Sequence, residues 1–159
     1  MIRTEYACCF TGHRIIKADI YNTLPQKLEN KIKALINKGF CDFICGGALG
    51  FDTLAAQTVL KLRAEFNHIR LILALPCENQ TKGWSDANTQ IYNQILKQAD
   101  VVHYISQTYT AGCMMKRNRF MVDNSKACVF LLTNQRSGTY KTVEYALDNG
   151  KELHNILVK

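Results

Sequence analysis

The sequence predicts a doubly wound α/β fold, with a mainly parallel sheet and helices on both of its faces. Apolar runs of strand length alternate with segments of helical spacing along the whole chain. The runs are apolar at successive positions, as in "IRLILAL" at residues 69–75, so both faces of each strand must be covered. These two observations indicate a Rossmann-like sheet. The 159 residues fit a single domain over 1–159, because domains commonly hold about 100–200 residues.

The same patterns place the elements in order. Leucine and isoleucine recur at helical spacing from Leu24 to Ile36, with Pro25 in the first turn and Gly39 beyond the end. Thr23 and Gln26 are expected to form a capping box. The expected strands are 6–10, 42–45, 69–75, 101–105, 127–132 and 153–158. The later helices are expected to follow the apolar stripes 55–66 and 84–95 and the segments 114–124 and 139–149.

Composition limits the function classes. No stretch approaches the ~18 apolar residues of a membrane helix and the N-terminus lacks a signal-peptide core, so we expect a cytoplasmic protein with no membrane partner. The seven cysteines form no CxxC pair, which argues against a metal site and favours reduced thiols that pack as small apolar groups. The net charge of +7 suits an anionic partner, although the lysines form no dense block.

Polar residues gather where the expected strands end. In a parallel sheet these exits share one edge, and the helices that follow direct their N-terminal N–H groups to it. The first exit, "TGHR", offers Thr11 and Arg14 as phosphate contacts and Gly12 as a point of close approach. His13 is either a structural hydrogen-bonding group or a titrating one.

Two further exits are rich in glycine. In "GGALGFD" at 46–52, Gly46, Gly47 and Gly50 would let the backbone approach a ligand closely. Asp52 either caps the following helix or accepts a hydrogen bond from a ribose hydroxyl. "SGTYKT" places Ser137, Gly138 and Thr139 at a helix start, which suits phosphate. Neither turn is a Walker P-loop or a GxGxxG fingerprint.

Two residues away from these turns complete the candidate site. Arg117, in "MMKRNRFMVDNS", either faces inward with Met114 and Met121 or belongs to a solvated basic helix. Trp84 either stacks on a base or packs in the core.

The combination of "FTGHR" (10–14), "GGALGFD" (46–52), "RNRFMVDNS" (117–125) and "SGTYKTVEYALDNGK" (137–151), with Gln80 and Trp84, resembles the SLOG superfamily. These are Rossmann-like nucleotide-ligand domains that include the DNA-processing protein DprA and the LOG phosphoribohydrolases. Within the superfamily the chain is most similar to the DUF1273 group of bacterial and prophage proteins, typified by YpsA- and YoqJ-like members.

The resemblance implies functional roles for particular residues. "RNRFMVDNS" is similar to the Arg-Asn-Arg stretch that DprA proteins use near single-stranded DNA. Met114, Arg117 and Met121 match a LOG pattern whose arginine acts with a glutamate to cleave the N-glycosidic bond of nucleoside monophosphates. The position of that glutamate is Thr142 here, and Glu144 lies about 200° away around an ideal helix.

We therefore expect a nucleotide or nucleotide-derived ligand, bound by a sensor or regulatory module. N-glycosidic hydrolysis of nucleoside monophosphates and single-stranded DNA binding remain the two alternatives. For hydrolysis the candidate catalytic residues are His13, Arg117 and Glu78. No cofactor other than a bound nucleotide is implied, and a homo-oligomer is left open.

Overall fold

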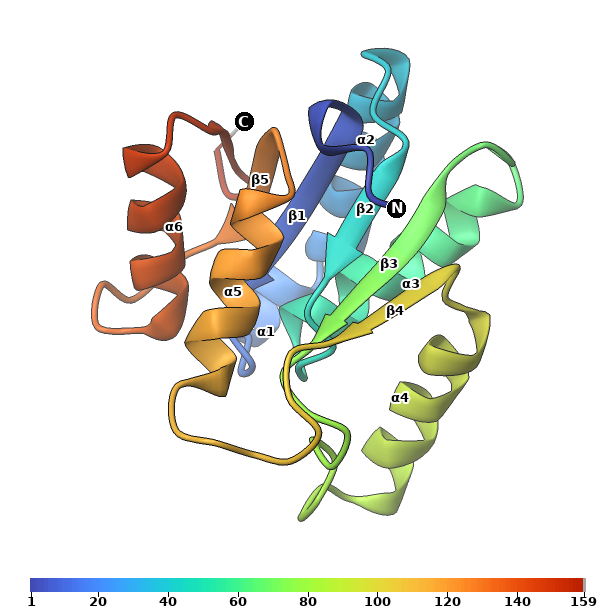
Figure 1. Ribbon diagram of the computed structural model, residues 1–159. Helices are drawn as coiled ribbons and strands as arrows, with labels where there is room; N and C mark the ends of the chain where they lie inside the picture. Colours follow the sequence, from blue (N-terminus) through green and yellow to red (C-terminus); the bar gives the residue numbers. More distant parts are fainter. Residues whose placement is uncertain (159) are drawn as a thin grey trace.

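Six parallel strands form the central sheet of the structure, a computed structural model that describes residues 1–158 (Figure 1). Their order across the sheet is β4-β3-β2-β1-β5-β6. All five neighbouring pairs are parallel, which confirms the predicted fold class. The strands are β1 (Ala7–Gly12), β2 (Asp42–Cys45), β3 (Arg70–Leu75), β4 (Val101–Tyr104), β5 (Ala127–Leu131) and β6 (Glu152–Asn155).

Helices cover both faces of this sheet. They are α1 (Ala18–Tyr21), α2 (Leu24–Asn37), α3 (Phe51–Arg63), α4 (Asp86–Gln98), α5 (Cys113–Asp123) and α6 (Gly138–Asp148), and a short 3-10 turn, Thr4–Tyr6, precedes β1. Figure 1 shows α5 and α6 on one side and α2 and α3 on the other. The core is correspondingly divided in two. Alternate residues of β1 point to opposite clusters: Cys8 and Phe10 face α2 and α3, whereas Ala7 and Cys9 face α5 and α6.

Three features at helix ends differ from the sequence prediction. The capping box at Thr23 is absent because the chain arrives from α1, which the sequence did not predict, in a helical conformation (φ −106°, ψ −11°). The Thr23 hydroxyl instead donates to the Ile20 carbonyl at 3.4 Å. Trp84 lies before α4, because the Ser85 hydroxyl caps that helix by accepting a 3.2 Å hydrogen bond from the backbone N–H of Asn88. The helix α3 ends at Arg63, before Phe66.

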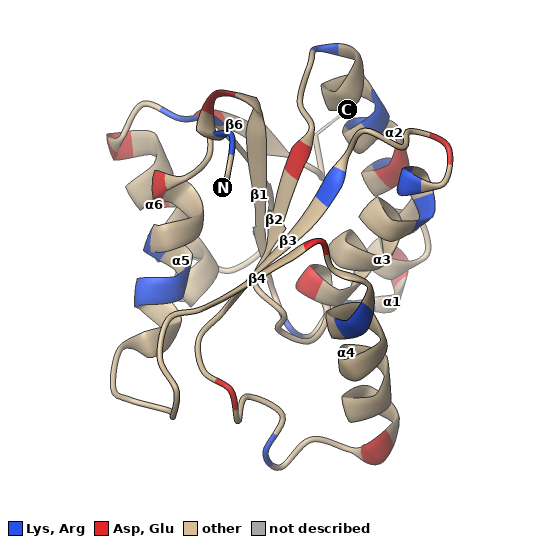
Figure 2. Ribbon diagram, turned by 45° about the vertical axis from the view of Figure 1, so that its right-hand side comes forward, with Lys and Arg blue, Asp and Glu red and all other residues tan. Residues whose placement is uncertain are grey.

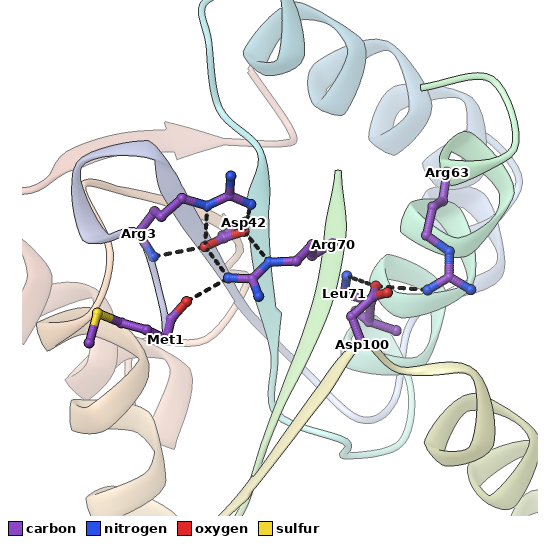
Figure 3. A network of polar contacts seen from close by, with 7 residues as sticks. All are labelled: Met1, Arg3, Asp42, Arg63, Arg70, Leu71 and Asp100. Carbon is purple, nitrogen blue, oxygen red and sulfur yellow. Dashed lines mark hydrogen bonds and ion pairs between the residues drawn. The ribbon is translucent and has the colours of Figure 1, made fainter. Parts of the chain in front are cut away.

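An ion cluster around a buried carboxylate lies at the amino ends of β2 and β3 (Figure 3). Asp42, the fully buried first residue of β2, accepts hydrogen bonds at 2.8–3.3 Å from the backbone and guanidinium of Arg3. Arg70 binds both carboxylate oxygens at 2.9 Å and donates to the Met1 carbonyl at 2.6 Å. These guanidinium groups hold the pKa of Asp42 at about 2, against the opposing effect of burial. The cluster therefore connects the strands at their amino ends, and the expected site lies at the opposite, carboxyl ends.

The other charged residues and the cysteines do not gather at one place in the fold. Lys and Arg are spread over helices on both sides of the sheet (Figure 2). All seven cysteines are free and buried, which confirms that they pack as small apolar groups. Within residues 1–158, no helix combines the length and the apolar composition needed to cross a membrane.

Candidate ligand-binding site

A cavity of about 270 Å³ opens at the carboxyl ends of β1 and β5. The sheet order changes direction here: chain segments that follow β1 build the sheet towards β4, whereas β5 and β6 lie on the other side. Such switch points are where open α/β sheets bind ligands. The cavity is lined by Thr11, Gly12, His13, Arg14, Ala48, Asp52, Met114, Arg117, Asn118, Ser137, Gly138 and Thr139.

Most of the residues expected from the sequence meet in this cavity, and some do not. All four residues of "TGHR", all three of "SGT", Asp52 and Arg117 line it. Five other candidates do not line it: Gly46, Gly47, Gly50, Glu78 and Trp84. Glu78 is exposed, and Trp84 packs edge-on against Tyr92 with ring centroids 5.5 Å apart.

Arg117 is the buried cation of the cavity. Its side chain faces inward from α5 and is only 5% exposed. One terminal nitrogen, Nη1, donates to the Gly46 carbonyl, and Nε donates to Asn118 Oδ1 at 2.8 Å. The other, Nη2, lies 3.7 Å from the sulfur of Met114. Burial lowers the pKa of Arg117, but a guanidinium remains charged at neutral pH. The cavity therefore holds a fixed positive charge.

Asp52 is the carboxylate that faces this cation. It lies in the first turn of α3, is 5% exposed, and its Oδ2 accepts a 3.2 Å hydrogen bond from the Ala48 backbone N–H. Burial raises the pKa of Asp52 to about 6, although Arg117 and the Ala48 N–H oppose the rise. The pKa of this carboxyl group therefore lies closer to neutral pH than that of an ordinary aspartate.

Two of the candidate glycines make room for protein side chains. A Cβ at Gly46 would lie 2.7 Å from Nη1 of Arg117 and 2.8 Å from Oδ2 of Asp52. A Cβ at Gly12 would overlap the ring of Phe51. Gly46 therefore lets the cation and the carboxylate approach the turn, and Gly12 lets β1 pack against α3.

His13 joins the exits of β1 and β5. Its Nε2 accepts a 2.8 Å hydrogen bond from the backbone N–H of Thr133, and its carbonyl accepts one of 3.1 Å from Phe51 N–H. Burial lowers the pKa of His13, which favours the neutral ring that this acceptor role requires. The geometry therefore supports a positioning role.

The start of α6 forms the opposite wall. Ser137 caps the helix by accepting a 3.2 Å hydrogen bond from Tyr140 N–H. Thr142 is buried, and its hydroxyl donates a 2.9 Å hydrogen bond to the Gly138 carbonyl. Glu144 lines a separate groove between α5 and α6. Among the residues that line the cavity, Asp52 is thus the one carboxylate.

Three lining residues were not among the predicted ligand contacts, although Met114 was one of the residues expected to accompany an inward-facing Arg117. Ala48, Met114 and Asn118 belong to the cavity, and Asn118 orients Arg117 through Nε. Asn118 could have been predicted as a lining residue because it directly follows Arg117 in the sequence. Met114 precedes Arg117 by three residues and so shares its helix face.

Solved structures similar to this chain show the same fold. DNA processing protein A from Helicobacter pylori, described for its single-stranded DNA binding mode, aligns with a TM-score of 0.69 over 94% of this chain at 18% identity. The DprA protein of Streptococcus pneumoniae aligns with a TM-score of 0.65 over 94% of this chain at 19% identity. The chain spans 64% and 49% of those two proteins.

Relatives at higher identity are bacterial and prophage-derived. The SPbeta prophage-derived protein YoqJ of Bacillus subtilis is 31% identical over 142 residues, which cover 79% of this chain and 83% of YoqJ. The UPF0398 protein SERP1017 of Staphylococcus epidermidis is 25% identical over 150 residues, covering 89% of this chain and 78% of that protein. The model of the YpsA family, described as the YspA SLOG family, matches residues 8–159. The chain therefore belongs to this SLOG family.

Proposed function

We propose that the protein binds a nucleotide or a nucleotide-derived ligand in the β1–β5 cavity and acts as a sensor or regulatory module. One observation carries this proposal: the buried guanidinium of Arg117, the exposed side chain of Arg14 and the N-terminus of α6 line a single cavity at the strand switch. Two cations and a helix N-terminus form a site for a phosphate group.

The phosphate would lie against the first turn of α6. The leading N–H groups of a helix have no partner within the helix and point along its axis. Ser137 and Thr139 add hydroxyl groups at the same place. Asp52, on the facing wall, would accept a hydrogen bond from a ribose hydroxyl.

Replacing Arg14 by alanine tests the phosphate contact. We expect the Kd for AMP to rise about tenfold, because one charge-assisted hydrogen bond is lost at the mouth of the cavity. The melting temperature should stay unchanged, since Arg14 is exposed. Isothermal titration calorimetry measures both variants, with Lys97→Ala, an exposed cation on α4, as the control. Unchanged AMP binding by Arg14→Ala would contradict the phosphate contact.

The pH dependence of anion binding tests the role of Asp52. Because its pKa is raised to about 6, Asp52 carries a negative charge at pH 7.5 and is mostly neutral at pH 5. Sulfate keeps its charge over this range, so its affinity should increase as Asp52 is protonated. We expect the increase to be about tenfold larger in the wild type than in Asp52→Asn, which retains only the contribution of His13. Identical pH profiles for the two proteins would disprove the coupling.

The same raised pKa has a consequence for folding. A carboxyl group whose pKa is raised in the folded state stabilises the fold below its unfolded pKa, and this contribution is lost as the pH rises through 6. Asp52→Asn removes that dependence, so thermal melts of the two proteins over pH 4–8 provide an independent measure of the pKa.

Hydrolysis of an N-glycosidic bond is the second candidate function, and Asp52 is the observation that favours it. A buried carboxyl group with a pKa of about 6 faces Arg117, although Thr142 occupies the position of the family glutamate. Water would add to the anomeric carbon as the bond to the base breaks, with Asp52 as the acid–base group. Incubation with AMP and analysis for free adenine tests this hydrolysis. If no base is released from any of a panel of nucleoside monophosphates, the hydrolytic function is ruled out.

Single-stranded DNA binding is the remaining alternative, since a neighbour of the same fold is described for it. Lys116 and Arg119 are exposed on α5, but the cations as a whole are spread over both sides of the sheet (Figure 2). Fluorescence anisotropy with an oligo-dT probe at low salt separates this function from nucleotide binding, because DNA affinity falls steeply with salt.

A further inference from the structure

Two buried side chains near the glycine turn that follows β2 leave their polar atoms without a hydrogen-bond partner. Within residues 1–158 neither the amide oxygen nor the amide nitrogen of Gln80 is paired, and the hydroxyl of Tyr92 is unpaired too. Gln80 is 8% exposed and Tyr92 is 9% exposed. Buried polar atoms in proteins are nearly always satisfied, so three such atoms together indicate that something else hydrogen-bonds to them.

Both side chains rest on the glycine turn that follows β2. A Cβ at Gly47 would lie 3.3 Å from Oε1 of Gln80 and 3.4 Å from Cε1 of Tyr92. The preceding residue, Gly46, is in contact with Arg117 and Asp52 of the cavity. One turn thus contacts both groups of side chains, with Gly46 next to Arg117 and Asp52 and Gly47 next to Gln80 and Tyr92.

We infer that Gln80 and Tyr92 recognise the base of a nucleotide whose phosphate occupies the β1–β5 cavity. This inference rests on the proposed function and adds the identity of the ligand class, a purine nucleotide such as AMP. A glutamine amide presents a donor beside an acceptor, which matches the edge of adenine that carries N6 and N7. Burial raises the pKa of Tyr92 to about 12, so its hydroxyl is protonated at neutral pH and can donate a further hydrogen bond.

Binding of the base requires the segment 76–85 to move, because Gln80 lies in it and is covered in the ligand-free protein. This segment connects β3 to α4 without a helix or strand, through turns closed by hydrogen bonds such as Lys82 N–H to Asn79 O and Trp84 N–H to Thr81 O. Trp84, the only tryptophan of the chain, ends the segment and packs edge-on against Tyr92. Its fluorescence therefore reports on this movement.

The test compares AMP with ribose 5-phosphate, which lacks the base. We expect both to bind in calorimetry and AMP to bind at least about tenfold more tightly, since it gains the hydrogen bonds of the base. Only AMP should change the fluorescence of Trp84. Gln80→Met and Tyr92→Phe should reduce the advantage of AMP to less than about threefold and leave the affinity for ribose 5-phosphate unchanged.

The same variants have a second readout that needs no ligand. If the polar atoms serve a ligand, removing them eliminates an unsatisfied group, and the melting temperature of the free protein should rise by about 2–4 °C. If they serve the fold, through a buried water, the melting temperature should fall. Gln94→Met and Tyr109→Phe make the same changes at exposed positions and should leave it unaltered.

The outcomes separate the two proposals. Equal binding of AMP and ribose 5-phosphate, or a fall in the melting temperature of both variants, overturns base recognition and leaves phosphate binding intact. If neither compound binds, the proposed function fails and base recognition fails with it.

Discussion

Arg117→Met is expected to abolish nucleotide binding, with a loss in affinity of at least about a hundredfold. The buried guanidinium supplies the fixed positive charge of the cavity, and methionine replaces it with an unbranched apolar side chain that carries no charge. Its hydrogen bonds to the Gly46 carbonyl and to Asn118 are lost as well. Calorimetry with AMP measures the binding, and urea unfolding measures the stability.

The stability of this variant should fall by only about 1–3 kcal/mol. Without Arg117, the pKa of Asp52 rises further above 6, so the carboxyl group takes up a proton at neutral pH and no buried charge remains unpaired. Adding Asp52→Asn to Arg117→Met should therefore recover part of the stability but none of the binding.

Arg119→Met is the matched control for this experiment. Arg119 lies two residues further along the same helix, is exposed, and stacks over the ring of Tyr145 at 5.4 Å. Its loss should cost about 0.5–1 kcal/mol and leave AMP binding unchanged. Equal effects of the two arginine substitutions on binding would show that the cavity is not the site.

Asp42→Asn is expected to produce the largest loss of stability, about 2–4 kcal/mol. Asp42 is fully buried and accepts hydrogen bonds from the guanidinium groups of Arg3 and Arg70 (Figure 3), so an amide would leave two cations without their anion. Part of each guanidinium reaches solvent, which limits the cost. The cluster lies at the amino ends of the strands, and AMP binding by the remaining folded protein should be unaffected.

Acid unfolding gives the same cluster a second signature. Since the pKa of Asp42 is lowered from 3.8 to about 2, its contribution of about 2 kcal/mol is complete above pH 3.8 and disappears as the pH falls through 2. The asparagine variant should lack this part of the acid transition. Lys61→Ala, which removes a surface ion pair with Glu29, serves as the control and should cost less than about 1 kcal/mol. A similar cost for both substitutions would contradict the role of the buried cluster.

Local patterns predicted the sheet and its helices well, and their failures have local causes. The apolar stripe that suggested a helix from Trp84 was misleading, because Trp84 reaches Tyr92 from a loop. The capping box at Thr23 failed because α1, a single turn too short for a periodic pattern, delivers the chain in a helical conformation. The Asp42 cluster joins residues 28 and 39 positions apart, and no sequence spacing indicates such a contact.

The candidate site was predicted in part for an equally physical reason. Parallel strands alternating with helices require all strand exits to share one edge, so the polar exits alone indicated "TGHR", Asp52 and "SGT". Which exits meet depends on the order of the strands. Because β1 lies between β2 and β5, the exits of these three strands surround the cavity, while Glu78 and Trp84, which follow β3, lie outside it.

The amino-acid pattern thus predicted a parallel, doubly wound fold with polar residues gathered at one edge of the sheet, since periodicity and turn residues act over a few neighbouring positions. The tertiary contacts established the depth of Arg117, the pKa of Asp52 and the unpaired state of Gln80 and Tyr92. Each of these properties depends on which distant residues exclude water from a side chain. Burial of that kind arises only when the helices close over the sheet.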